Sequence, residues 1–344
     1  MRSGCAEKWL QFRIGAVFSC ALQKFFGFKQ KMKFKSFIAA LAITLSTALS
    51  AATMPESISI TYVKSPFNLQ NIVMKERGML EDAFKADGVS IKWRVINSGA
   101  VQGQAMASGD LDFSAVMNTA SVLMAAGAGN PIAIASGVAH PQKIFALIGK
   151  PGTNYSVKDL KGKKVAGPKG TVLHQLLVAA LLKEGMKISD VDFVNMDPGK
   201  AMTAVVSGQV DAGLVAAGLI IKANAAGAKT IATCEGYVSP NLVMTVRRAF
   251  AQQYPEAYEK VVATNRAALA WIKAHKAEAL AMGAKEQGIS MADAEKLYDW
   301  SGFYDVLTEA DVKSLETDQA FLLENGMMEK KVDVRALILP GAMK

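Results

Sequence analysis

Residues 103–112 read Gly103-Gln-Ala-Met-Ala-Ser-Gly-Asp-Leu-Asp112, and residues 199–211 read Gly199-Lys-Ala-Met-Thr-Ala-Val-Val-Ser-Gly-Gln-Val-Asp211. Each stretch has the order helix, Ser-Gly turn and Asp, and is followed by a short apolar strand, a loop of small residues and an alanine-rich helix. That order is typical of a crossover unit in an α/β sheet, where the strand ends face a ligand. Two copies predict two α/β lobes that face each other across a cleft. One larger sheet that repeats the same unit is the alternative.

Length and charge narrow the class of protein. The 344 residues are enough for two domains with cores, and 51% of them are hydrophobic, which indicates a folded globular protein. The formal net charge of +9 is concentrated at the start, because residues 1–52 hold eight Lys or Arg and one acid. The 31 basic and 29 acidic residues that remain do not make the clustered basic surface that nucleic-acid binding requires, so no nucleic-acid partner is expected.

The segment 32–52 has the features of a secretory signal peptide. Met32-Lys-Phe-Lys35 is a short basic start, residues 37–49 form an apolar run too short to span a bilayer, and Ser50-Ala-Ala52 offers small residues for cleavage. We expect a cleaved signal, a mature start near Thr53 and a periplasmic location. Residues 1–31 then have no role, and we interpret them as a mis-assigned upstream segment with Met32 as the initiator. An amphipathic anchor over residues 9–28 is the alternative.

Few side chains could support a metal site or catalysis. Two of the three cysteines lie before residue 32, and the histidines are only His140, His174 and His275. This scatter predicts no metal and no cofactor. Cys234 is interpreted as a small buried hydrophobe, and the sequence has neither a Gly-x-Ser-x-Gly motif nor a phosphate-binding loop. We therefore expect no enzymatic activity.

Alternating strand and helix patterns divide the chain into three parts. Residues 53–147 are expected to form the first lobe, residues 148–238 the second, and residues 239–344 to return to the first lobe and end in helices that brace it. Two crossings between the lobes would then form a hinge. Strands are expected at 57–63, 91–96, 113–117, 132–136, 145–148, 164–166, 191–195, 212–215, 230–232 and 241–246.

Several stretches in a fixed order carry a family resemblance. Asp159-Leu-Lys-Gly-Lys-Lys-Val165 precedes Lys169-Gly-Thr-Val-Leu-His174-Gln-Leu-Leu, residues 201–211 follow, and residues 321–337 close the series. In this order, from about residue 57 to 339, the chain resembles the periplasmic solute-binding proteins of ABC importers. It is most similar to the aliphatic-sulfonate, taurine and nitrate type and its pyrimidine-precursor-binding relatives.

The resemblance implies a two-lobed, type II-like periplasmic-binding-protein fold with the ligand between the lobes. It implies capture of a small anionic solute by hinge closure and its delivery to a membrane permease with a cytoplasmic ATPase. We expect the chain to be a monomer. The chain departs from the sulfonate pattern at Gly213 and at residues 216–218, where that group carries tryptophans and an Asp-Pro, and this departure predicts a larger pocket. A sensor's binding subunit and, on the same fold, a pyrimidine-precursor enzyme are the alternatives.

Helix starts are the expected ligand contacts, because free backbone N–H groups and the helix dipole favour anions there. Residues 170–172 begin a helix of the second lobe, and residues 118–120 begin its counterpart in the first, although Thr119 and Thr171 fit simple helix caps as well. His174 faces either the cleft or the core, and residues 216–217 either line the cleft or pack helices. The expected ligand-binding residues are Ser65, Phe67, Asn68, Ser98, Gly99, Asn118, Thr119, Ala120, His140, Gly170, Thr171, Val172, His174, Ala216 and Ala217.

Overall fold

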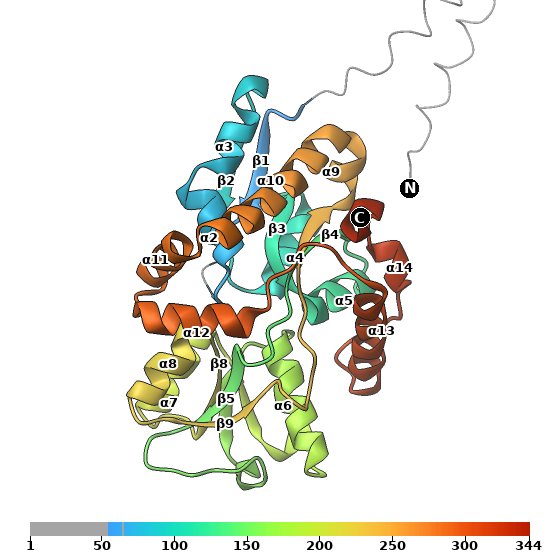
Figure 1. Ribbon diagram of the computed structural model, residues 1–344. Helices are drawn as coiled ribbons and strands as arrows, with labels where there is room; N and C mark the ends of the chain where they lie inside the picture. Colours follow the sequence, from blue (N-terminus) through green and yellow to red (C-terminus); the bar gives the residue numbers. More distant parts are fainter. Residues whose placement is uncertain (1–53, 64) are drawn as a thin grey trace, which may run out of the picture. The chain divides into compact units, whose positions relative to one another are not determined.

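The computed structural model describes residues 54–63 and 65–344 (Figure 1). The expected signal peptide over 32–52 and the segment 1–31 lie outside the described residues. Within the described ranges, no helix combines the length and the apolar character that crossing a membrane requires.

The described strands form two five-stranded sheets. The first sheet has the order β2-β1-β3-β10-β4 and the second the order β7-β6-β8-β5-β9. The strands of the first sheet are β2 (Ser90–Arg94), β1 (Ser57–Thr61), β3 (Phe113–Asn118), β10 (Leu242–Arg247) and β4 (Ile132–Ala139). Those of the second are β7 (Asp192–Asn195), β6 (Lys164–Gly167), β8 (Ala212–Ala216), β5 (Phe145–Gly149) and β9 (Lys229–Thr233).

The two sheets follow one plan. In the first, β1 runs parallel to β2 and β3, and β10 runs antiparallel to β3 and β4. In the second, β6 runs parallel to β7 and β8, and β5 runs antiparallel to β8 and β9. The two-lobed α/β fold is therefore confirmed, and the alternative of one larger sheet is wrong.

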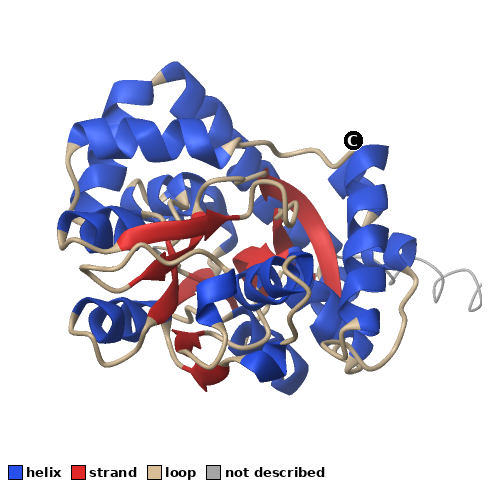
Figure 2. Ribbon diagram, turned by 90° about the horizontal axis from the view of Figure 1, so that it is seen from below, coloured by secondary structure: helices blue, strands red, loops and turns tan. Residues whose placement is uncertain are grey.

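The helices surround the strands (Figure 2). Those in the first part of the chain are α2 (Leu69–Glu76), α3 (Met79–Phe84), α4 (Gly99–Ser108) and α5 (Thr119–Gly127). The helices between the strands of the second sheet are α6 (Val172–Lys183), α7 (Pro198–Val206) and α8 (Gly218–Ala225). After β10 come α9 (Arg248–Gln253), α10 (Pro255–Ala274), α11 (Lys276–Gln287), α12 (Met291–Ser301), α13 (Glu309–Glu324) and α14 (Val334–Leu337).

The repeated Ser-Gly turns end helices. Gly109 closes α4 with φ 85°, and Gly208 follows α7 with φ 75°, so both occupy the left-handed conformation that glycine adopts without strain. The chain then enters β3 or β8, which lie at the same place in their sheets. Every residue of β8, and all but the last of β3, is buried, because helices cover both faces of each sheet.

Strand ends differ from the expected ones where a partner strand ends. The strand expected over 91–96 covers only Ser90–Arg94, because its partner β1 runs from Ser57 to Thr61 and the last pair is Thr61 with Arg94. The long helical region after Pro255 is divided at His275 into α10 and α11.

Two segments connect the sheets. Residues 140–144 lead from β4 into β5, and residues 234–241 lead from β9 back into β10. The expected boundary between residues 147 and 148 falls inside β5, which pairs with β8 from Phe145 to Gly149. The division of the chain into lobes stays a prediction, now with these two connections as its natural borders.

Candidate functional site

The starts of three helices meet, two of which follow strands of the first sheet and one a strand of the second. Ser98 is the residue before α4 and Thr171 the residue before α6. The hydroxyl of Ser121, in the first turn of α5, donates a 3.0 Å hydrogen bond to the carbonyl of Gly170. A Cβ on Gly170 would lie 4.0 Å from the Cβ of Ala100 in α4. Helices that follow β2, β3 and β6 are thus brought together from two sheets.

Two of these helices begin without a side-chain cap. Neither Ser98 nor Thr171 accepts a hydrogen bond from its own helix, and the Thr171 hydroxyl instead donates to the carbonyl of Pro168 at 3.0 Å. The cap reading of Thr171 is therefore wrong. The first N–H groups of α4 and α6 lack an acceptor from the cap residue, and the helix dipoles make both positions favourable for negative charge.

The start of α5 is capped and tied into the fold. The Asn118 side chain accepts from the N–H of Ser121 at 2.9 Å, so Asn118 is a helix cap. The N–H of Thr119 donates to the carbonyl of Asn241 at 2.9 Å, and its hydroxyl donates to the Asp318 carboxylate over 3.4 Å. Ala120 is buried. These three residues hold α5 in position next to the other two helix starts.

His174 is a buried, neutral side chain. It lies in the first turn of α6 after the buried Val172, its ring is 4.9 Å from that of Phe193, and its Nδ1 has no hydrogen-bond partner. Burial, and then the charge of Lys169, lower the pKa of His174 to about 4. Of the two positions considered from the sequence, the packing against Phe193 of β7 places the ring within the second sheet's layer.

The loop before α2 has a structural role at two of its three expected positions. Phe67 is buried against Gly283 of α11, where a Cβ would lie 2.6 Å from its ring. The Asn68 amide donates to the carbonyl of Val63 at 2.9 Å, which closes the loop. Ser65 is partly exposed. These contacts give Phe67 and Asn68 a structural role in the core, and their contact with a ligand stays a prediction.

The small residues at the end of β8 lie close to the first connection between the sheets. Ala216 pairs with Phe145, and the N–H of Ala217 donates to the carbonyl of Ile144 at 2.8 Å. Ala217 has φ 50°, a strained value for a residue with a side chain, and such strain gathers at functional sites. Gly213 packs inward, since a Cβ there would lie 2.6 Å from Val205. The absence of a side chain at Gly213 therefore does not enlarge a ligand pocket, and the prediction of a larger pocket at this position is wrong.

His140 belongs to a polar network on the first connection. Its Nε2 lies 2.6 Å from the Asp311 carboxylate, and its ring stacks at 3.8 Å on that of Tyr304. The Asn241 amide also donates to Asp311 at 3.0 Å, and the Tyr304 hydroxyl donates to the Asn241 carbonyl. Burial would raise the pKa of Asp311, but hydrogen bonds from Thr308 and His140 together lower it. The network joins both connections to α13.

Sequence reasoning missed the buried polar residues of α13. Asp311 and Asp318 are seven residues apart on one helix and both are buried, where α13 meets residues far away in the chain. Acidic residues two turns apart on the apolar face of a helix are the one signal in the sequence for such a role. Their partners His140, Thr119 and Gln175 carry no such signal.

A pocket of about 480 Å³, here named the α13 pocket, lies beside this network. Its walls come from α13, from Gln175 of α6, from Gln142 of the first connection and from residues 236–239 of the second. Its buried polar residues are Gln175 and Asp318, which are 2% and 8% exposed. Among the described residues no group of three His, Cys, Asp or Glu could hold a metal ion, and burial raises the pKa of the Cys234 thiol.

Comparisons with known proteins agree with this fold. A family model described as NMT1/THI5 like matches residues 80–279. A Bacillus subtilis (strain 168) protein provisionally named an aliphatic sulfonates-binding protein is 28% identical over 274 residues, which cover 78% of this chain and 81% of that protein. The taurine-binding periplasmic protein of Escherichia coli (strain K12) is 30% identical over 185 residues, which cover 50% of this chain and 54% of that protein.

Among solved structures, the alkanesulfonate-binding protein SsuA from Xanthomonas axonopodis pv. citri, bound to MOPS, has a TM-score of 0.74 at 22% identity. The match covers 83% of this chain and 98% of that chain, and it shows that the two sheets adopt the fold of a two-lobed binding protein. The family model covers more than half of the residues, so this chain belongs to the NMT1/THI5-like family.

Proposed function

We propose that this chain is the solute-binding subunit of an ABC importer. It captures a small anionic organic solute, such as a sulfonate, in the periplasm and passes it to a membrane permease with a cytoplasmic ATPase, without chemistry on the solute. The names of the relatives support this class, and the signal-like segment 32–52 supports the location.

The observation that carries the proposal is the meeting of two uncapped helix starts. The α4 start follows a strand of the first sheet and the α6 start follows a strand of the second, and neither has a side-chain cap. A sulfonate offers three acceptor oxygens to such N–H groups, and the N-terminal ends of both dipoles favour its charge. The backbone N–H groups of Gly99, Thr171 and Val172 then contact the solute, with the backbone of Ser98 and Gly170 beside them.

Hinge closure is the mechanism that this arrangement supports. The connections 140–144 and 234–241 would be the hinge, between a lobe built on the first sheet and a lobe built on the second. In this mechanism the hydrogen bond from Ser121 of α5 to the carbonyl of Gly170 before α6 would form when the lobes close. A solute that engages both helix starts binds the closed state better and shifts the population toward it.

The test removes one N–H group and leaves the helix intact. Val172 is the first residue of α6, where proline is well tolerated, and Thr171 before it has the extended conformation that proline requires. We expect Val172→Pro to weaken sulfonate binding at least tenfold in isothermal titration calorimetry, with a loss of stability of about 1 kcal/mol or less. Met291→Pro, at the exposed first position of α12, is the matched control and should bind like the wild type.

A panel of alkanesulfonates, taurine, nitrate, carboxylates and pyrimidines defines the solute class by the same titration. Binding of none of these, or unchanged affinity in Val172→Pro, would contradict the proposed site. Turnover of a bound solute would place the chain among enzymes instead, and stable capture of a sensor protein in place of a permease would favour a sensor subunit.

A further inference from the structure

Asp318 carries a buried charge that no side chain in the described part of the chain neutralises. Its carboxylate accepts hydrogen bonds from the Gln175 amide at 2.8 Å and from the Thr119 hydroxyl at 3.4 Å, and both donors are neutral. Within residues 54–63 and 65–344, Asp318 takes part in no ion pair. The side chain is 8% exposed, and what remains of its surface lines the α13 pocket.

The electrostatics of Asp318 agree with the missing counter-charge. Burial raises its pKa to about 6, and only the hydrogen bonds from Gln175 and Thr119 oppose that rise. Lys313 lines the same pocket from the same helix but is not among the groups that shift the pKa of this carboxylate. At neutral pH the group is still ionised, and a buried ionised carboxylate is unfavourable unless it is paired.

The remaining walls of the pocket suit an organic cation. Phe321 and Tyr237 provide aromatic surface, on which cations bind favourably, and the Tyr237 ring already has the Lys183 Nζ 4.8 Å from its centroid. Ser239 and Thr317 add hydroxyl oxygens that can accept from an N–H donor. A volume of about 480 Å³ lies within the usual range for small-molecule sites.

We propose that the α13 pocket binds a small organic ammonium ion, with the Asp318 carboxylate as its counter-charge and the rings of Phe321 and Tyr237 against its carbon atoms. This site takes a cation through side chains of α13 and the second connection, next to the first turns of α5 and α6, whereas the anionic solute is bound by backbone N–H groups at the starts of α4 and α6. It does not depend on the identity of that solute, because binding is measured with no sulfonate present.

The first experiment titrates propylammonium chloride into the full-length chain at pH 7.5 by isothermal titration calorimetry, at an ionic strength fixed with sodium chloride. We expect saturable one-to-one binding that is at least tenfold weaker in Asp318→Asn. Glu316→Gln is the matched control, because it removes an exposed carboxylate from the same helix and should leave the affinity unchanged. Potassium chloride should give no saturable binding, and equally tight potassium binding would overturn the organic class of the ligand.

A second measurement uses only the wild type, so it holds even where Asp318→Asn folds poorly. Propylammonium stays charged over this range, and binding should weaken about tenfold per pH unit below pH 6, as the carboxylate takes up a proton. The other titratable groups around Asp318 are Lys313 on its own helix and Cys234 and Tyr237 on the second connection. From α5 and α6 come the Thr119 hydroxyl and the Gln175 amide, and α6 also carries Lys183, whose Nζ lies over the Tyr237 ring. Affinity that stays constant from pH 7.5 to 5, or no saturable binding at pH 7.5, would overturn the proposal.

Discussion

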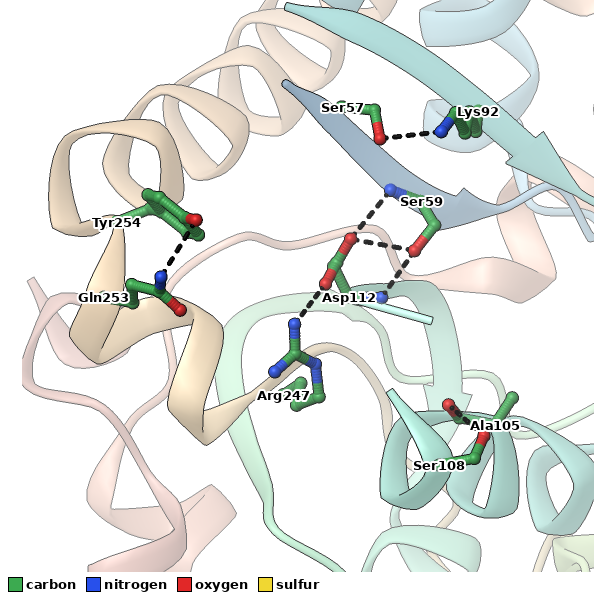
Figure 3. Close-up of polar contacts among 9 residues, drawn as sticks. All are labelled: Ser57, Ser59, Lys92, Ala105, Ser108, Asp112, Arg247, Gln253 and Tyr254. Carbon is green, nitrogen blue, oxygen red and sulfur yellow. Dashed lines mark hydrogen bonds and ion pairs between the residues drawn. The ribbon is translucent and has the colours of Figure 1, made fainter. Parts of the chain in front are cut away.

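Asp112 and Asp211 lie at equivalent positions, each just before the central strand of its sheet, and each carboxylate connects the two neighbouring strands. Asp112 accepts from the N–H and the hydroxyl of Ser59 in the parallel neighbour β1, and from Arg247 at the end of β10 (Figure 3). Asp211 accepts from the N–H of Lys164 in the parallel neighbour β6 and pairs with Lys150, just after β5. Each carboxylate ties a parallel strand to the antiparallel strand beyond it.

The contacts of Asp112 with Ser59 and Arg247 should contribute to the stability of the fold. Asp112→Asn removes the charge that pairs with Arg247 at 2.7 Å and leaves a half-buried guanidinium without its partner. We expect the free energy of unfolding to fall by about 2–4 kcal/mol, measured by urea denaturation. Asp110→Asn, two residues away at an exposed carboxylate, should change it by less than about 0.5 kcal/mol. Equal losses of unfolding free energy in the two variants would show that the contacts of Asp112 stabilise the fold no more than an exposed carboxylate does.

For single residues, the sequence predicted the place in a helix or strand better than the contacts that the side chain makes. The order of residue types around Asp112 and Asp211 was enough to place both at strand starts, because local spacing determines this. Asn118 lies at the expected helix start, yet its side chain serves as a cap, which the sequence left open. His140 meets Asp311, which lies 171 residues further on, and no local pattern encodes a contact of that range.

The packing of α4 against α5 depends on a glycine. A Cβ on Gly99 would lie 2.6 Å from the Ser121 Oγ and 2.7 Å from the Ser121 Cβ, which is closer than side-chain atoms approach. The missing side chain therefore lets the two helix starts meet, and Ser121 then reaches Gly170 of the second sheet's layer. Gly99, one of the small residues expected near the site, therefore acts by letting the backbone of α4 come close to α5.

A double-mutant cycle tests this contact. Gly99→Ala should lower the free energy of unfolding by about 1–3 kcal/mol through overpacking, and Ser121→Gly by about 1 kcal/mol through helix propensity and the lost bond. In the double variant the clash is gone, so its loss should be smaller than the two single losses together by about 1 kcal/mol in urea denaturation. Strictly additive losses would mean that a side chain at position 99 has no steric clash with Ser121.

Elements were predictable where a pattern is local and long. The alternation of apolar strands and helices gave the two-sheet fold, whereas the end of β2 at Arg94 depended on the length of its partner strand. The site at the helix starts follows from the same alternation, because strand ends in parallel sheets meet at one edge. The α13 pocket could not be predicted from this alternation, because it forms only where α13 packs against both connections between the sheets.

On the scale of the whole molecule, two buried groups give opposite responses of stability to pH. The folded-state pKa of His174, about 4, lies below its ordinary value of 6.5, so its stabilising contribution is present above pH 6.5 and is lost as pH falls toward 4. The folded-state pKa of Asp318, about 6, lies above its ordinary value of 3.8, so its contribution is present below 3.8 and is lost as pH rises through 6. The two effects overlap and oppose each other between about pH 4 and 6.

Single substitutions should separate these responses. His174→Gln removes the loss on acidification, so between pH 7 and 4.5 this variant should lose less free energy of unfolding than the wild type. Asp318→Asn removes the gain, so it should lose more over the same interval. One pKa unit corresponds to 1.36 kcal/mol, so each difference should reach roughly 2–3 kcal/mol in urea denaturation at pH 7, 6, 5 and 4.5. Carboxylates elsewhere cancel in the comparison, because all three proteins share them. Parallel pH profiles for the three proteins would show that neither group titrates in the folded chain as its burial requires.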